Sequence, residues 1–235
     1  NLFQTAKGAK AIGEASVWYL YSEVAIKEIE KTFPDSKYIV CLRSPVQMAH
    51  SLYWEQVFAT NEDVKSFSEA WTLSDKRADG ERVVRHCREP KHLDYKRACM
   101  LGFQVGRLLE TVSRDRVLFV FLEDLSAHPN NVYEELISFL DVSFHALESY
   151  QPSNTFKKVR WRPVKLIVRY LGFLRQFVPI KKSFGILNFL NAKNKKQSSK
   201  PVIDSELESA MKIFFKDDVH RLASLTGRRL DSWLE

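Results

Sequence analysis

The sequence lacks the features that would place it in several specialised classes of protein. No apolar run reaches the about 18 residues that a transmembrane helix needs, so none is expected. Its 8 glycines and 8 prolines among 235 residues give no collagen-like or disordered composition, and no internal repeat is visible. The N-terminal stretch NLFQTAKGAK has neither an apolar signal-peptide core nor an initiator Met, which predicts a fragment or a processed product. The 45% apolar content is enough for one full globular domain.

Cysteine and clustered histidine are also scarce. The three cysteines, Cys41, Cys87 and Cys99, lack metal-ligand spacing and favour a reduced, cytoplasmic protein, with a Cys87–Cys99 disulfide as the alternative. No metal site is expected, because four of the histidines also lack ligand spacing: His50, His86, His92 and His128.

Acidic residues are absent between Glu148 and Asp204, where 13 of the 36 basic residues lie. The remaining 23 basic residues face 29 acidic ones, so this stretch carries all the excess positive charge. We interpret residues 152–200 as a basic helical segment, with an amphipathic helix at 164–178. It has three interpretations: a cover that supplies cations to a donor or an anionic acceptor, a membrane-surface helix, or a helix packed on the domain. Nucleic acid is not expected, because no nucleic-acid motif accompanies the charge.

Helical and strand patterns alternate along the chain. This order is typical of an α/β fold, a central parallel sheet flanked by helices, and we predict a single domain over 1–235. The expected helices are 22–32, 44–58, 94–112, 130–140, 204–215 and 217–226, the last ending at Gly227, and the expected strands are Lys37–Leu42 and Val117–Leu122.

The stretch CLRSP marks a corner where the first strand gives way to a helix. Arg43 ends the strand, Ser44 is expected as the N-cap, and Pro45 fits the first helical position. Ser51 lies seven residues after Ser44, about two helical turns, and so shares its face. An arginine fork with hydroxyls at a helix N-terminus suits a phosphate. The alternative is an arginine paired with a surface carboxylate and a serine that only caps the helix.

This corner resembles the 3′-phosphate-binding element of the PAPS-dependent sulfotransferases of the bacterial or glycan type. In CLRSPVQMAHSLY, Arg43, Pro45, Ser51 and Tyr53 fall on the family's positions. Three further blocks are similar to family segments and occur in the family's order: IGEASVWYLYS, VFLEDLSAHPNNVYEELISFLDV and RLASLTGRRLDSWL.

The resemblance implies a P-loop-like three-layer α/β domain and an activity. The activity is in-line transfer of a sulfuryl group from PAPS to a hydroxyl or amine of a carbohydrate, lipid or small molecule. Arg43 and Ser51 would bind the 3′-phosphate of the donor and of its product PAP, without a metal. Glu14 matches the general base of glycan-type members, and its alternative role is a structural carboxylate. A Golgi-lumenal domain is then the alternative to a cytoplasmic location.

The sequence also departs from the family's pattern. Ala15 follows Glu14 where many members have Lys. The family's Pro-Lys-x-Gly-Thr-Thr loop, which holds the 5′-phosphosulfate, is not found and is expected N-terminal to Asn1. This favours, as the alternative function, a non-catalytic nucleotide- or anion-binding module associated with a membrane surface.

Other residues are weaker candidates for the same site. Trp18, Tyr53 and Tyr95 are predicted to contact substrate, with core packing as the alternative. Glu123 and Asp124 end the second strand, and a structural role is favoured over acid–base chemistry.

Overall fold

The computed structural model describes residues 8–84, 87, 89–147, 149–150, 157–159, 195–197 and 200–235. They fall into two compact units, which are considered separately. Unit 1 comprises Asn1–Met48, Ala98–Tyr150 and Ser209–Glu235, and unit 2 comprises Ala49–Arg97 and Gln151–Glu208.

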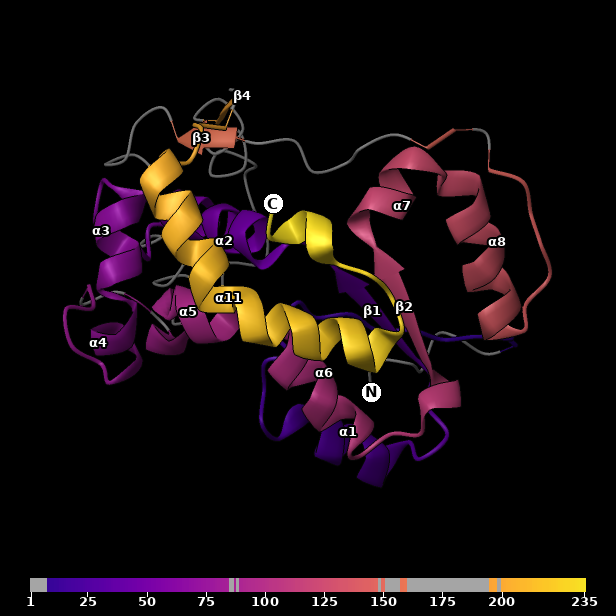
Figure 1. The fold of residues 1–235 in the computed structure, drawn as a ribbon. Coiled ribbons are helices and arrows are strands. Elements are labelled where there is room, and N and C mark those ends of the chain that lie inside the picture. The colour runs from indigo at the N-terminus through magenta and orange to yellow at the C-terminus, as the bar shows by residue number, and fades with distance from the viewer. Residues whose placement is uncertain are drawn as a thin grey trace, which may run out of the picture. The chain divides into compact units, whose positions relative to one another are not determined.

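Unit 1 contains the predicted parallel sheet, which has two strands. β1 (Tyr38–Leu42) pairs with β2 (Val117–Phe121) in a register that matches Leu42 with Phe121, and Figure 1 shows them side by side. Four of the five β2 residues are buried, as expected for a parallel strand covered on both faces. The other elements that lie wholly in unit 1 are α1 (Ala25–Thr32), α6 (Leu101–Leu109), η2 (Arg114–Arg116), α7 (Leu122–Ala127), α8 (Pro129–Leu140) and η3 (Asp231–Trp233).

The strand-to-helix corner forms where the sequence predicts it. α2 (Pro45–Ala59) begins at Pro45, and the Ser44 carbonyl accepts from the Met48 N–H at 2.9 Å, as in a first helical turn. Gly227 follows α11 (Ser205–Thr226) with φ of 71°, which confirms the predicted helix end. Two details differ from the prediction. The second strand ends at Phe121, where helix α7 (Leu122–Ala127) follows without having been predicted, and α11 is one continuous helix rather than the two expected at 204–215 and 217–226.

The helix predicted over 94–112 is broken after Ala98, so that α5 (Tyr95–Ala98) and α6 are separate. The break is explained by a contact between α6 and α11 within unit 1. The Asp218 carboxylate of α11 accepts from the backbone N–H groups of Gly102 and Phe103, at 2.8 Å each. It caps α6 from a distant part of the chain and fixes a new helix start at this point. Burial raises the pKa of the Asp218 carboxyl, partly offset by these two bonds.

Glycine lets α6 lie against α11, which is visible in Figure 1. A Cβ on Gly102 would overlap the backbone carbonyl oxygen of Asp218, and one on Gly106 would meet the Arg221 guanidinium 2.6 Å away. The Gly106 clash involves a flexible side chain, whereas the Gly102 clash involves backbone.

We therefore expect Gly102→Ala to lower the free energy of unfolding by about 2 kcal/mol or more, because α6 and α11 must move apart. Urea denaturation measures the change. Gly13→Ala is the matched control, since nothing lies within 4 Å of its added Cβ. Equal stability of the two variants would contradict the close packing at Gly102.

Arg116 joins the start of β2 to the turn between α1 and β1. Its guanidinium donates to both carboxylate oxygens of Glu30, at 3.1 and 2.6 Å, and to the carbonyls of Pro34 and Ser36. Tyr38 also donates to Glu30, at 2.9 Å. The hydrogen bond from Arg116 is the main reason that the pKa of the Glu30 carboxyl lies below its usual value.

Because the folded-state pKa of Glu30 is depressed, its stabilising effect is present above the unfolded pKa and is lost as pH falls through the folded value. Glu30→Gln should therefore lower the thermal midpoint at pH 7. The gap from the parent chain should close as pH falls below the ordinary glutamate value of about 4.3. Calorimetry from pH 7 to pH 3 tests this, and a gap that stays constant would contradict it.

Unit 2 has a buried charged cluster. The Arg77 guanidinium binds both oxygens of the Glu62 carboxylate, and the Tyr95 hydroxyl donates to the same carboxylate at 2.8 Å. All three side chains are nearly inaccessible to solvent, so each depends on the others for hydrogen bonds. The short helices around this cluster are α3 (Phe67–Thr72), α4 (Ser74–Ala78), η1 (Pro90–Leu93) and α5.

Unit 2 also holds an antiparallel ribbon made of β3 (Lys157–Val159) and β4 (Lys195–Gln197). These six residues were predicted within a basic helical segment, and for them that prediction was wrong. The amphipathic helix predicted at 164–178 lies outside the described residues.

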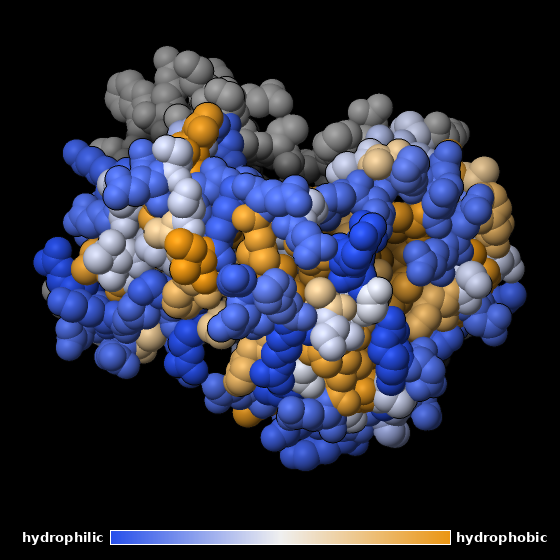
Figure 2. All heavy atoms as spheres, viewed as in Figure 1, coloured by the Kyte–Doolittle hydropathy of each residue, from blue (hydrophilic) through white to orange (hydrophobic). Residues whose placement is uncertain are grey.

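The surface is mainly hydrophilic on the side seen in Figure 2, with apolar patches between charged residues. Among the described large apolar residues, the most exposed are Val202, Val17 and Ile213, at 92%, 81% and 76%. Within the described ranges, no helix is long and apolar enough to cross a membrane.

Candidate functional site

Arg43 lies at the carboxyl end of β1, the edge of a parallel sheet where ligands usually bind. Its side chain is half-buried, and its Nε is buried without a hydrogen-bond partner among the described residues. Burial lowers the pKa of the Arg43 guanidinium, partly offset by Cys99 and by the Glu123 carboxylate. An arginine N–H left unpaired at this position is a donor that a bound anion could satisfy.

The acidic pair after β2 is held by the C-terminal segment. Asp124 accepts from both terminal nitrogens of Arg228, and Glu123 accepts from Trp233 Nε1 at 3.0 Å. Arg228 also stacks over the Phe121 ring, with its Cζ 4.2 Å from the centroid. The Arg228 hydrogen bonds lower the pKa of the Asp124 carboxyl. These contacts fit the structural role that the sequence favoured for the pair.

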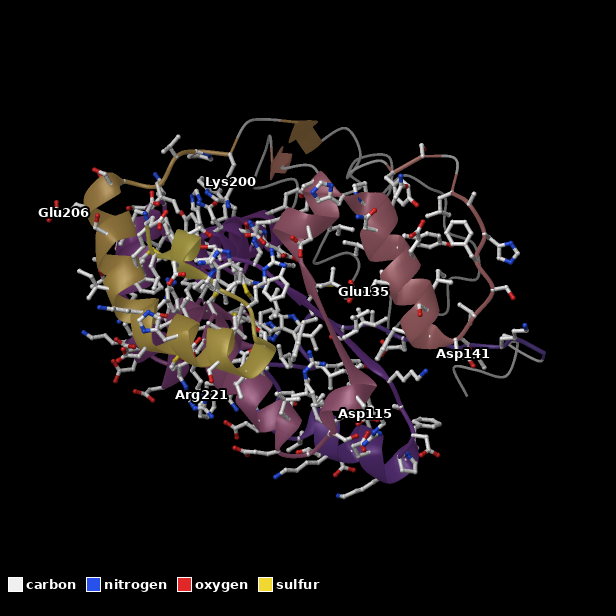
Figure 3. All side chains as sticks on the ribbon, turned by 45° about the vertical axis from the view of Figure 1, so that its right-hand side comes forward. Asp115, Glu135, Asp141, Lys200, Glu206 and Arg221 are labelled. Atoms are coloured by element: carbon white, nitrogen blue, oxygen red, sulfur yellow. The ribbon has the colours of Figure 1, made fainter. Side chains whose placement is uncertain are left out.

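Ser51 lies on α2, in the part of that helix that belongs to unit 2. Its hydroxyl accepts a hydrogen bond from Lys200 Nζ at 2.8 Å. Lys200 is labelled in Figure 3, on the segment that leads into α11. A cation therefore lies beside the hydroxyl that the sequence assigned to phosphate binding, and the two groups together offer a positively charged hydrogen-bonding site.

His50, next to Ser51, is buried at 3% exposure. Its Nε2 accepts from Trp54 Nε1 at 2.9 Å, so the neutral ring carries its proton on Nδ1. Burial and the Lys200 ammonium lower the pKa of His50 to about 4. His50 is therefore neutral at pH 7 and adds no charge beside Ser51.

Glu14 lies in the irregular segment before α1 and is exposed. Its carboxylate accepts a short hydrogen bond from the Tyr19 hydroxyl, which raises the pKa of Tyr19. The segment is tied to α6, because Arg107 donates to the carbonyls of Leu20 and Tyr21 at 2.7 and 2.9 Å. Glu14 thus has a solvent-facing carboxylate, which a proton acceptor needs, and its catalytic role stays a prediction.

The three aromatic candidates have different surroundings. Trp18 is partly exposed and makes an edge contact with Tyr21 at 5.9 Å between centroids. Tyr53 and Tyr95 are buried, and their hydroxyls donate to the Val64 carbonyl and the Glu62 carboxylate. Their predicted contact with substrate remains a prediction, but both hydroxyls already have partners inside unit 2.

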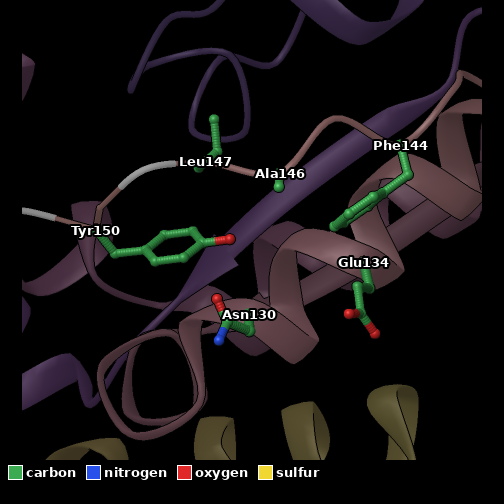
Figure 4. Close-up of a pocket in the computed structure, with 6 residues that line it drawn as sticks. All are labelled: Asn130, Glu134, Phe144, Ala146, Leu147 and Tyr150. Carbon is green, nitrogen blue, oxygen red and sulfur yellow. The ribbon is translucent and has the colours of Figure 1, made fainter.

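Two pockets differ in how well their lining residues suit an anionic ligand. The first, of about 210 Å³, lies in unit 1, where Figure 4 shows Tyr150 reaching over the start of α8 toward Asn130. Among the described residues that line it, Glu134 is the only charged one, so this lining does not suit an anion. The second, of about 440 Å³, lies in unit 2 and is lined by two cationic, two acidic and three aliphatic residues: Lys65, Arg82, Asp63, Glu69, Val64, Leu73 and Val83.

Among the described residues, no group of three or more His, Cys, Asp or Glu side chains could hold a metal ion. No disulfide joins Cys87 to Cys99, so the alternative bridge is not formed in this structure.

The comparisons with known proteins show a likeness in structure rather than in sequence. No family model matches this sequence, and no curated protein matches it. The structure is similar to the crystal structure of a sulfotransferase from Alicyclobacillus acidocaldarius, with a TM-score of 0.68 and 24% identity. The match covers 100% of this chain and 72% of that chain. It shows that this chain has the fold of that sulfotransferase, which confirms the predicted α/β fold.

Sequence reasoning missed two partners of the candidate residues. Tyr19 was within the quoted block IGEASVWYLYS, so its link to Glu14 had a local signal. Lys200 is 149 residues from Ser51, and only the excess of positive charge before Asp204 pointed toward it.

Proposed function

We propose that this chain belongs to a PAPS-dependent sulfotransferase. The observation that carries the proposal is the unpaired, buried Nε of Arg43 at the carboxyl end of β1, in a chain with a sulfotransferase fold. The three further sequence blocks that resemble family segments support the same function.

In the proposed site, Arg43 and Ser51 bind the 3′-phosphate of the donor. Arg43 would supply charge-assisted hydrogen bonds, and Ser51 a hydroxyl whose neighbour Lys200 adds a second positive charge. The fit is chemical: each of these groups is a donor or a cation, and a phosphate oxygen is an acceptor with negative charge.

Glu14 is the proposed general base. As the acceptor oxygen bonds to sulfur, the bond from sulfur to the 5′-phosphate oxygen breaks, and PAP leaves with that electron pair. The acceptor's proton passes to the Glu14 carboxylate, so the sulfated product and PAP are the only products. Tyr19 holds Glu14 before the transfer.

A transfer assay tests the proposal. The chain is incubated with PAPS labelled on sulfur and with a panel of carbohydrate, lipid and small-molecule alcohols. Label on an acceptor, together with PAP formation, is the expected result. Binding of PAP without any transfer would support the non-catalytic nucleotide-binding module, and absence of both would overturn the proposal.

A further inference from the structure

The chain turns sharply at the end of α8 in unit 1 and folds back along that helix. Asp141 adopts a positive φ of 54° at this turn. Its N–H donates to the Ser138 carbonyl at 3.1 Å, and the N–H of Val142 donates to the Ile137 carbonyl at 3.2 Å. These two bonds form a Schellman motif, which ends the helix and redirects the chain. The chain then returns toward the start of α8, as Figure 4 shows.

Three aromatic rings gather where the returning chain meets α8. The centroid of the Tyr133 ring lies 5.7 Å from that of Phe144 and 6.2 Å from that of Tyr150. The Tyr133 hydroxyl donates to the His145 carbonyl at 3.0 Å, which holds the returning chain on the helix. Phe144 and Tyr150 are nevertheless exposed, at 54% and 36%, so a ligand can reach both side chains.

Phe144 and Tyr150 line the pocket of about 210 Å³ described above, together with Asn130, Glu134, Ala146 and Leu147. Glu134 is exposed and is the only charged residue among those described in this lining. The pocket therefore combines aromatic rings with one carboxylate.

The surrounding sequence has the same charge as the pocket. No Lys or Arg occurs between Arg116 and Lys157, a stretch that holds 6 acidic residues, although the chain has 36 basic residues and a net charge of +7. This stretch includes all of α8 and the chain that returns along it. Its charge favours the approach of a cation and opposes that of an anion.

We propose that this pocket binds a small organic cation with a methylated ammonium group. A ligand cation is attracted to an aromatic face within about 6 Å of the ring centroid, and quaternary ammonium groups are recognised in this way. Phe144 and Tyr150 supply the rings, and Glu134 supplies the opposite charge. A primary ammonium group fits less well, because it is strongly hydrated. The sulfuryl donor is an anion, so the inference does not rest on the proposed function.

The first test asks whether the pocket requires both the charge and the methyl groups. Choline is titrated into the isotope-labelled whole chain, and the NMR shifts of the backbone amides report binding. The two control ligands are ethanolamine and the neutral alcohol in which a tert-butyl group replaces the trimethylammonium group. We expect choline to bind at least about fivefold more tightly than the neutral alcohol at low salt, and more tightly than ethanolamine.

The second test uses matched variants of the lining. Glu134→Gln should weaken choline binding by about threefold to tenfold at low salt. Glu135→Gln removes the same charge from the next exposed residue of α8, which does not line the pocket, and should change the affinity by less than about twofold. Tyr150→Leu should cost about twofold to fivefold, as expected for one exposed ring, whereas Tyr150→Phe should retain binding.

Three results would each overturn the inference. Equal affinity for choline and the neutral alcohol would assign the pocket to apolar ligands, and equal affinity for choline and ethanolamine would remove the role of the methyl groups. Equal choline affinity in Glu134→Gln and Glu135→Gln would place the cation elsewhere. Thermal midpoints show whether each variant is folded, and Phe144→Leu repeats the ring test at a second exposed position.

Discussion

Replacing Glu14 by Gln should lower turnover by about 10² to 10⁴-fold, the range that general-base catalysis contributes. Glutamine keeps the size and hydrogen-bonding shape of the side chain but cannot take the acceptor's proton. PAP affinity should stay the same, because Glu14 is not assigned to the donor phosphate. Rates from the sulfur-label assay and PAP titration of the same preparation measure both quantities.

Glu23→Gln is the matched control for this experiment. Glu23 is an exposed glutamate of the same N-terminal segment, just before α1, and has no assigned role. It should retain full turnover. If Glu14→Gln is as active as Glu23→Gln, Glu14 is a structural carboxylate held by Tyr19 and another group is the base.

Replacing Arg43 by Ala should weaken PAP binding by about 10 to 100-fold, since a hydrogen bond to a charged group contributes about 1.5–3 kcal/mol. This loss of affinity should come from the contact with the 3′-phosphate alone. Arg43→Lys should give an intermediate loss, because it keeps the charge but not the planar fork that matches a phosphate. Calorimetric titration with PAP measures all three chains.

Arg229→Ala serves as the control, because Arg229 is an exposed arginine of the same unit. Thermal midpoints of both alanine variants show whether the half-buried Arg43 also supports folding. A folded Arg43→Ala chain that binds PAP as tightly as Arg229→Ala would remove Arg43 from the donor site.

The parts of the fold that depend on local chemistry could be predicted from the sequence. Pro45 begins a helix because its ring fits the first helical position, and Gly227 ends one because it accepts a positive φ. The strand at Tyr38–Leu42 ends beside Arg43 as its apolar run predicts. Each of these depends on residues within a few positions of one another.

The parts that were wrong or missed depend on residues far apart in the chain. The break between α5 and α6 is fixed by Asp218, which is 116 residues from Gly102. The helical periodicity of residues 94–112 does not predict this break, because the capping carboxylate lies outside that stretch. The contact of Lys200 with Ser51 is likewise long-range, and so is the tether of Asp124 by Arg228 across 104 residues.

The candidate site is partly predictable for the same reason. Arg43, Ser51 and Glu14 were found through short motifs, whereas the buried state of Tyr53 and Tyr95 follows from packing against Phe67 and from hydrogen bonds. An aromatic residue near a motif has the same sequence pattern whether it lines a pocket or fills a core.

The most direct test of the account compares two nucleotides that differ only in the 3′-phosphate. PAP and adenosine 5′-monophosphate are titrated against the parent chain under the same conditions. PAP should bind at least about tenfold more tightly, because Arg43 and Ser51 are the groups proposed to bind the 3′-phosphate. Equal affinity for the two nucleotides, or no binding of PAP, would contradict it.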